Sequence, residues 1–203
     1  MRTDFSVTDP DVNPYRLLTA VVVPRPIAWV STVSTDGIVN LAPHSFYTVA
    51  CARPPIVQFS SVGRKDTLHN VLATGEFVVN LAPATLLDQV NNSAARFAPD
   101  DSEVEALGIR MEPSATVRPP RVAASPVSIE CTVHSTTELG DSTVVLGDVR
   151  MISVAEEVLV DGHPDFSRLD PLARLGKDEW ALHAEVISVR RPGRPEEIAD
   201  LSG

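Results

Sequence analysis

The chain has 203 residues, of which 43% are hydrophobic and 22% are charged. These globular proportions exclude wholesale disorder and allow one domain with a full core. The formal net charge of −10 argues against nucleic acids and anionic membranes as partners, because both are bound through excess Lys and Arg. No apolar run is long enough to span a bilayer, and residues 1–5 lack a signal-peptide core, so a cytoplasmic protein is expected.

The first quarter of the chain predicts a short helix followed by a β-hairpin. Residues 13–20 favour the helix, with Pro14 near its first turn. Residues 27–34 are rich in β-branched and aromatic side chains and predict a strand, and a Thr-Asp-Gly turn leads into a second strand over 38–42. Pro43 is expected to interrupt that strand and to leave 44–47 as a polar and aromatic segment.

The middle of the chain predicts a strand, a helix and another strand. The apolar run 56–59 suits a buried strand, and residues 76–80 suit the next one. Between them apolar side chains recur at helical spacing. Asp66 or Thr67 is expected to supply the N-cap oxygen, and Gly75 to end the helix.

Two cations stand just before that helix. Arg64 and Lys65 follow a polar loop over residues 60–63, at a helix N-terminus whose backbone N–H groups and dipole are positive. Hydroxyls and fixed cations in this position predict a phosphate site, and in an acidic chain they would attract a small anion. On this stretch alone, an ordinary exposed turn before a well-capped helix is the favoured explanation.

The second half is mainly predicted strand. A helix is expected over 84–90 and a short one ends near Gly108, whereas 127–135 and 143–154 predict two long strands joined by a longer loop. A last strand is expected over 182–190.

Short strands and hairpin turns therefore dominate. They predict a mainly β protein, a closed or partly closed antiparallel β-barrel with a few flanking helices. No repeat or linker divides the chain, so we expect one domain over residues 1–203, with a core at about 13–190 and a loose tail from Pro192.

The motifs of the common enzyme classes are absent. The sequence has no GxGxxG, GxxxxGK[ST], HExxH or GxSxG, and its five histidines lack metal-ligand spacing, so no metal site is predicted. Cys51 and Cys131 form no CxxC pair and are expected to be buried thiols. Reasoning from the residues alone ends at a β-barrel with an anion site.

An ordered set of short motifs adds to this reasoning. RPIAWVSTV begins at Arg25 and is followed by DG, NLAP, SF, PPIV, KDTL, GEFVVN, PPRV, SP and LDPLARLG, which ends at Gly176. No single motif is specific, but the whole set, in this order and spacing, resembles the flavin reductase-like family.

The resemblance implies an FMN-binding split barrel of Greek-key type. It also implies a homodimer with flavin sites near the subunit interface, and non-covalently held FMN that exchanges a hydride with NADH or NADPH. The simplest function is an NAD(P)H:flavin reductase that supplies a partner monooxygenase. One alternative is an FMN electron carrier without nicotinamide turnover, which receives its electrons from another protein such as an electron-transfer protein. The other is a binding module on the same barrel that holds another anion instead of flavin.

The resemblance also implies site residues. The FMN phosphate is assigned to Arg64, Lys65 and Thr67. Seven residues on or beside strands are assigned to the flavin: Ser31, Thr32, Asn40, Pro43, His44, Ser45 and Ser60. No catalytic acid or base is named, because the hydride chemistry belongs to the flavin. Ser31 and Thr32 are equally well explained as ordinary strand residues. For Trp29, packing in the core or at a dimer interface is favoured over stacking on the flavin.

Two positions depart from the family pattern. His44 stands where relatives more often carry an aromatic residue or asparagine. A neutral imidazole can still hydrogen-bond the flavin ring and would then modulate its potential. Residues 177–180 stand where relatives often show a second glycine and a tyrosine, so the contacts to the nicotinamide need not follow the family.

Overall fold

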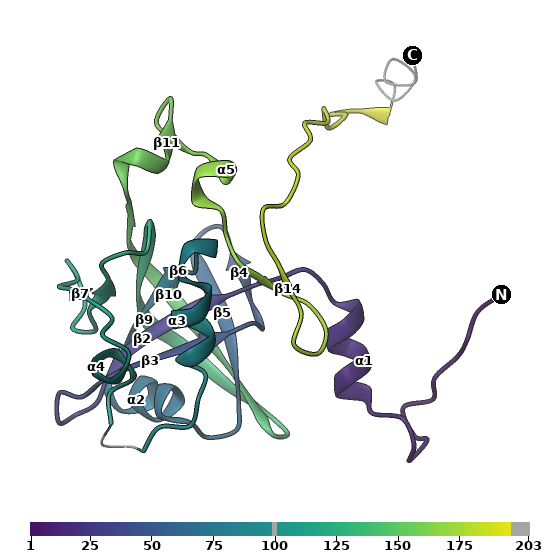
Figure 1. The fold of residues 1–203 in the computed structure, drawn as a ribbon, viewed down its shortest axis with the longest axis horizontal. Coiled ribbons are helices and arrows are strands. Elements are labelled where there is room, and N and C mark those ends of the chain that lie inside the picture. The colour runs from purple at the N-terminus through teal and green to yellow at the C-terminus, as the bar shows by residue number, and fades with distance from the viewer. Residues whose placement is uncertain (99–100, 196–203) are drawn as a thin grey trace.

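The fold is built on one antiparallel sheet of seven strands (Figure 1). The computed structural model describes residues 1–98 and 101–195. From edge to edge the strands are β3 (Val39–His44), β2 (Ala28–Val33), β6 (Glu76–Leu81), β9 (Val127–Leu139), β10 (Ser142–Val154), β5 (Ile56–Val62) and β4 (Tyr47–Cys51). Strands β5 and β6 follow each other along the chain but are separated in the sheet by β9 and β10, which is a Greek-key crossover. The sheet curls until β3 contacts β5, so the barrel is partly closed.

Short elements surround this barrel. The helices are α1 (Pro14–Val21), α2 (Asp66–Thr74), η1 (Ala84–Leu86), α3 (Leu87–Asn92), α4 (Glu103–Ala106), η2 (Glu156–Val158) and α5 (Phe166–Leu169). The short strands are β1 (Arg25–Pro26), β7 (Met111–Glu112), β8 (Arg121–Val122), β11 (Leu159–Val160), β12 (His163–Pro164), β13 (Ala173–Arg174) and β14 (Trp180–Ala181). Figure 1 shows α1 and the C-terminal segment, residues 182–195 of the described chain, projecting from the barrel. In the described residues, no helix has the length and apolar character of a membrane span.

The mainly β fold with few flanking helices is confirmed. The helix predicted over 13–20 is present as Pro14–Val21 with Asn13 as its N-cap, and the helix ending at Gly75 is also present. Gly75 has the left-handed conformation (φ 73°) of a helix C-cap. The long strands β9 and β10 are also present, but they extend to a tight turn at Gly140 and Asp141. The longer loop expected between them is therefore wrong.

Other differences follow from tertiary pairing. Strand β3 continues through Pro43, because β3 is an edge strand and tolerates a residue without an N–H. Strand β5 extends beyond Phe59 to Val62, since its last three residues pair with β10. The strand predicted over 182–190 is wrong: the final strand of the described chain is β14. A segment rich in β-branched residues forms a strand only where it can pair with a neighbouring strand of a sheet.

Strand β2 is buried on both faces and divides the core in two. Inside the barrel Ala28 and Val30 pack with Phe59 and Phe77. On the outer face Trp29 packs with Leu41, and with side chains of α3 and α4. Helix α2 contributes Leu68 and Val71 to the interior cluster, so its N-terminus is held firmly against the barrel. Trp29 belongs to the core, as the sequence indicates.

The two cysteines differ in burial. Cys131 lies inside the barrel, where burial raises the pKa of its thiol to about 12, and Asp148 and Glu130 add to the shift. Cys51 on β4 is only half-buried, so the expectation of full burial is wrong for that thiol.

Gly147 on β10 leaves room for a core aromatic ring. A Cβ atom at this position would collide with the ring of Phe77 and would lie 3.1 Å from Cβ of Cys131. We expect Gly147→Ala to lower the free energy of unfolding by about 2 kcal/mol, because overpacking forces side chains out of their rotamers. Urea unfolding measures the loss. In Phe77→Leu/Gly147→Ala the loss should be smaller than the sum of the single losses, and strict additivity would contradict the collision.

Glu130 on β9 anchors the segment before β8. Its fully buried carboxylate accepts hydrogen bonds from the backbone N–H groups of Ala115 (2.8 Å) and Thr116 (2.6 Å), and from Thr116 Oγ1 (2.6 Å). Burial alone raises the pKa of this carboxyl. These hydrogen bonds and the charge of Arg121 more than offset that effect, so the pKa lies below its ordinary value of 4.5.

The lowered pKa makes Glu130 a pH-dependent source of stability. The stabilisation is complete above pH 4.5 and is lost as the pH falls through the folded-state pKa. Glu130→Gln should therefore cost about 2 kcal/mol at pH 7 and less at pH 4. Urea unfolding at both pH values measures this, with the exposed Glu105→Gln as control. An equal cost of Glu130→Gln at both pH values would contradict the prediction.

Candidate functional site

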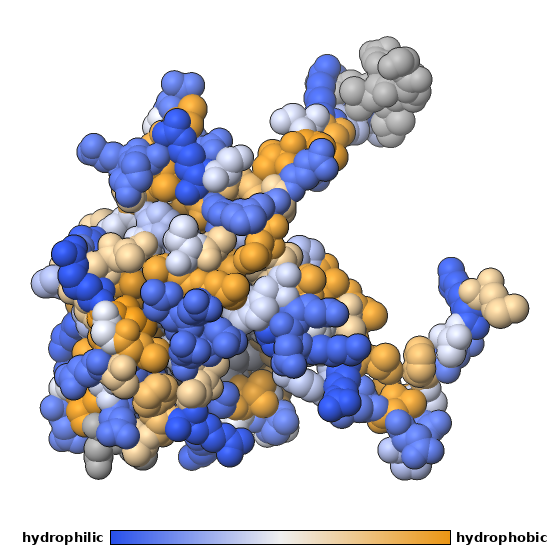
Figure 2. Space-filling view, in the orientation of Figure 1, coloured by the Kyte–Doolittle hydropathy of each residue, from blue (hydrophilic) through white to orange (hydrophobic). Residues whose placement is uncertain are grey.

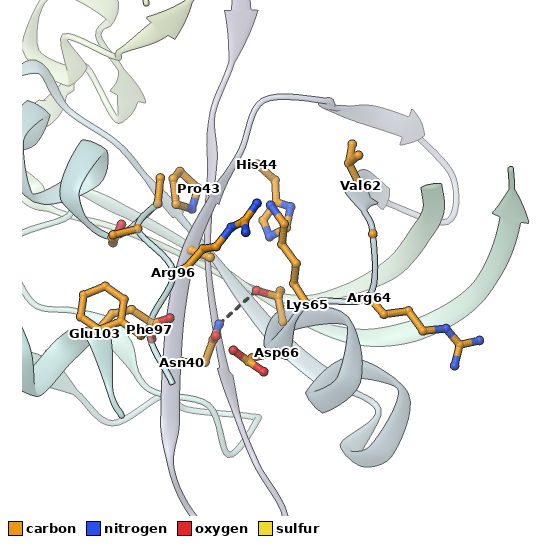
Figure 3. A pocket seen from close by; sticks show the side chains of 16 residues that line it. Asn40, Pro43, His44, Val62, Arg64, Lys65, Asp66, Arg96, Phe97 and Glu103 are labelled. Carbon is orange, nitrogen blue, oxygen red and sulfur yellow. Dashed lines mark hydrogen bonds between the residues drawn. The ribbon is translucent and has the colours of Figure 1, made fainter. Parts of the chain in front are cut away.

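A cavity of about 600 Å³ opens beside the edge strand β3 and the start of α2 (Figure 3). This volume lies in the range of small-molecule sites. Its walls come from β3, the turn after β5, the first turn of α2, the segment after α3, and α4. The lining residues are Asn40, Ala42, Pro43, His44, Val62, Gly63, Arg64, Lys65, Asp66, Thr67, Ser93, Ala94, Ala95, Arg96, Phe97 and Glu103.

The cavity brings together most of the residues that the sequence assigns to a cofactor. Those that line it are Asn40, Pro43, His44, Arg64, Lys65 and Thr67. Ser31, Thr32, Ser45 and Ser60 are not among the lining residues. The same cavity is therefore lined by the start of α2, where the anion site is expected, and by the polar end of β3.

Ser31 and Thr32 use their hydroxyls inside the fold. Ser31 Oγ donates to the Pro120 carbonyl (2.5 Å), and Thr32 Oγ1 accepts from Asn70 Nδ2 (3.1 Å). Both residues are fully buried because β2 is covered on both faces. Ser60 acts through its backbone, which forms a hydrogen bond with the His44 side chain.

The first turn of α2 has no side-chain cap among the described residues. The N-cap residue is Lys65, and no side chain accepts a capping hydrogen bond there, so the expected capping by Asp66 or Thr67 is wrong. Thr67 is buried, and its Oγ1 instead accepts from Asn40 Nδ2 (3.0 Å). The uncapped N–H groups of this turn are available to a ligand in the cavity.

Three cations of the described chain line the cavity, the two expected ones and Arg96, and their side chains point in different directions. Figure 3 shows Lys65 and Arg96 directed into the cavity, whereas Arg64 points away from it. The Arg64 side chain is 84% exposed and pairs with Glu138 (3.2 Å). Sequence reasoning missed Arg96, which lies in a segment without periodicity. Its position depends on tertiary contacts: Trp29 Nε1 donates to Ser93 Oγ (2.9 Å) and so fixes the start of that segment.

Two carboxylates, which sequence reasoning also left out of the site, line the cavity as well. Glu103 is buried, and its Oε2 accepts from the backbone N–H of Leu41 (3.1 Å). Burial raises the pKa of Glu103, and the nearby Asp66 carboxylate raises it further against the backbone hydrogen bonds. Ser102 Oγ donates to the Val39 carbonyl (2.7 Å), so α4 covers part of the free edge of β3.

His44, the last residue of β3, is neutral. Only 7% of it is exposed, and its ring lies 4.8 Å from that of Phe59. Burial lowers its pKa from 6.5 to about 4, the charge of Lys65 contributes to the lowering, and the Ser60 backbone hydrogen bond opposes the shift. No hydrogen-bond partner from the described part of the chain reaches Nε2.

Comparison with known proteins decides the family. Residues 20–169 match the sequence profile of the flavin reductase like domain. The chain belongs to this family. An uncharacterized protein of Halalkalibacterium halodurans is 38% identical over 190 residues, which cover 88% of this chain and 90% of that protein.

Solved structures share both fold and length. Nitrilotriacetate monooxygenase component B from Bacillus cereus superposes with a TM-score of 0.85 at 28% identity, over 93% of this chain and 100% of that one. The 2-nitrobenzoate 2-nitroreductase of Pseudomonas fluorescens gives a TM-score of 0.84 at 26% identity, over 94% and 97%. A split-barrel protein of Shewanella frigidimarina, at 20% identity and a TM-score of 0.82 over 90% and 95%, shares the fold. This flavin reductase-like chain is therefore a split-barrel protein, as its sequence motifs imply.

Proposed function

We propose that this protein is a cytoplasmic FMN-binding oxidoreductase that transfers a hydride from NADH or NADPH to flavin. The observation that carries the proposal is the cavity at the uncapped start of α2, lined by Lys65, Arg96 and Thr67, in a flavin reductase-like chain. The phosphate of FMN fits this end of the cavity, because free N–H groups, a helix dipole and two cations all favour a dianion.

Thr67 strengthens the phosphate assignment. Its Oγ1 already accepts a hydrogen bond from Asn40, so its own proton is available to a phosphate oxygen. Asn40 thereby orients the hydroxyl without contacting the phosphate itself. The carboxylate of Asp66 also lines the cavity and would repel the phosphate. The two cations offset that negative charge.

FMN, when bound, supplies the hydride chemistry. The chain's own residues bind and orient it: Lys65, Arg96 and Thr67 at the phosphate, and Pro43 and His44 along the polar end of β3. Arg64 is reassigned to the surface, where it pairs with Glu138. The hydroxyls of Ser31 and Thr32 hold β2 to its neighbours.

Similarity supports a proposal for the electron acceptor. Because the chain is similar to a monooxygenase component B, we propose that its reduced flavin serves a partner monooxygenase. An FMN-loaded sample mixed anaerobically with NADH, and separately with NADPH, tests the reductase. Bleached flavin bands and steady oxidation of the nucleotide in the presence of free flavin are expected. Bands that persist with both nucleotides would instead indicate an electron carrier.

We also propose a homodimer. Large apolar side chains are exposed on α1, where Leu18 and Val21 are 59% and 70% exposed, and on the C-terminal segment, where Ile187 and Val189 are 76% and 79% exposed. Figure 2 shows these projecting segments with apolar surface uncovered. A second copy of the chain would cover it. Light scattering should give twice the chain mass, and Ile187→Asp/Val189→Asp should shift it toward the monomer.

A further inference from the structure

One residue that lines the cavity has a buried nitrogen without a hydrogen-bond partner in the described part of the chain. Within residues 1–98 and 101–195, two buried side-chain nitrogens are in this state, Nε of Arg25 and Nε2 of His44. The guanidinium of Arg25 donates through its other nitrogens to backbone carbonyls, among them Val22 and Leu175. His44 differs, because it lines the cavity proposed to hold FMN. Buried polar atoms are nearly always paired, so a ligand is the expected partner of Nε2.

The imidazole is held in place before any ligand arrives. His44 ends β3 opposite Ala28 of β2, and the Phe59 ring lies against it at an interplanar angle of 52°. Figure 3 shows the Lys65 side chain extending from the start of α2 toward the imidazole. His44 therefore lies where the cation end of the cavity meets the end of β3.

The ring also has a defined protonation state. Its low pKa keeps it neutral at physiological pH, and a neutral imidazole offers one N–H donor and one lone pair. The His44 side chain also has a hydrogen bond with the backbone of Ser60 on β5. The polar edge of a flavin ring carries both donors and acceptors and can pair with either form of Nε2.

We propose that Nε2 of His44 hydrogen-bonds the polar edge of the flavin ring, and that His44 is the positioning residue that sets the ring's reduction potential. The inference rests on the proposed function, since it requires FMN in this cavity. A hydrogen bond to the ring differs in strength between oxidised and reduced flavin, and this difference is a change in potential.

His44→Phe and His44→Asn test the inference. Phe keeps an aromatic ring against Phe59 but removes Nε2, whereas Asn keeps a donor and an acceptor. Anaerobic titration gives the dissociation constants of oxidised and of reduced FMN. In His44→Phe we expect their ratio to change about tenfold, which corresponds to about 30 mV for a two-electron couple. In His44→Asn the ratio should return toward the wild-type value.

A structural role alone would give a different result. It would weaken both redox forms by one factor and leave the ratio unchanged, which would overturn the inference. His134→Phe, on the exposed part of β9, should leave both constants unchanged. Riboflavin separates the ring from the phosphate: an effect of His44→Phe on FMN that disappears with riboflavin would place the bond at the phosphate and also overturn the inference.

A measurement on the wild-type protein covers the case in which His44→Phe does not fold. Nitrogen-15 NMR of labelled histidine should show the His44 Nε2 resonance shifting on FMN addition, while that of His134 stays in place. An unmoved His44 resonance at saturating FMN would overturn the inference and leave the proposed function intact. A wild-type protein that binds no FMN would overturn both.

Discussion

We expect Lys65→Met/Arg96→Met to bind FMN about 100-fold more weakly than the wild type. The two cations directed into the cavity would each make a charged hydrogen bond to the phosphate, and one such bond contributes about 1.5–3 kcal/mol. Loss of both therefore costs at least about 3 kcal/mol, or two factors of ten in the dissociation constant. Quenching of FMN fluorescence during titration measures it. Folding is checked by the unfolding midpoint in urea.

Arg64→Met is the matched control for that variant. Arg64 is next to Lys65 in the chain and carries the same charge as Arg96, but it points away from the cavity and pairs with Glu138. Its removal should change the FMN dissociation constant by less than about threefold, since an exposed ion pair contributes little. An Arg64→Met variant that loses more affinity than Arg96→Met would restore the assignment made from sequence and contradict the cavity geometry.

The second large effect concerns acid stability of the FMN-free protein. His44 is neutral when folded because burial lowers its pKa from 6.5 to about 4. A lowered pKa means that the unfolded chain binds the proton first. The free energy of unfolding is therefore unaffected by this residue above pH 6.5 and falls as the pH drops toward 4. Each pKa unit corresponds to about 1.36 kcal/mol, so the loss is about 3 kcal/mol.

His44→Asn removes this titration. Urea unfolding at pH 7 and at pH 4.5 should show a smaller acid loss in the variant than in the wild type. Other charged groups also line the cavity: Lys65, Arg96, Asp66 and Glu103. They are the same in both proteins, so their contribution to the acid loss cancels in the difference between the variant and the wild type. Identical acid losses in the two proteins would contradict the neutral buried imidazole.

Local patterns predict the helix at the phosphate site well. Apolar spacing and Gly75 define α2, and its N-terminus identifies Lys65 and Thr67 as candidates from the sequence alone. The same local signal cannot choose between Arg64 and Arg96. That choice depends on Glu138 at the β9–β10 hairpin and on Ser93, which Trp29 fixes from β2. Both contacts join residues far apart in the sequence.

Motif residues cannot be sorted into binding and structural roles from sequence. Asn80 belongs to the family-like GEFVVN motif, yet its amide is used within the fold. Nδ2 donates to the Trp29 carbonyl (3.0 Å), and Oδ1 accepts from the backbone N–H of Val122 (2.8 Å). Ser31 lies in another such motif and also bonds within the fold. In a central strand that is buried on both faces, a polar residue that binds a ligand and one that bonds within the fold lie in the same apolar sequence pattern.

A titration of the purified, flavin-free protein with FMN and with riboflavin tests the phosphate site most directly. We expect one FMN per chain and riboflavin bound about 100-fold more weakly, because riboflavin lacks the phosphate that the start of α2, Lys65 and Arg96 would hold. Equal affinity for the two flavins would contradict the phosphate site. Absence of FMN binding would contradict the proposed function itself.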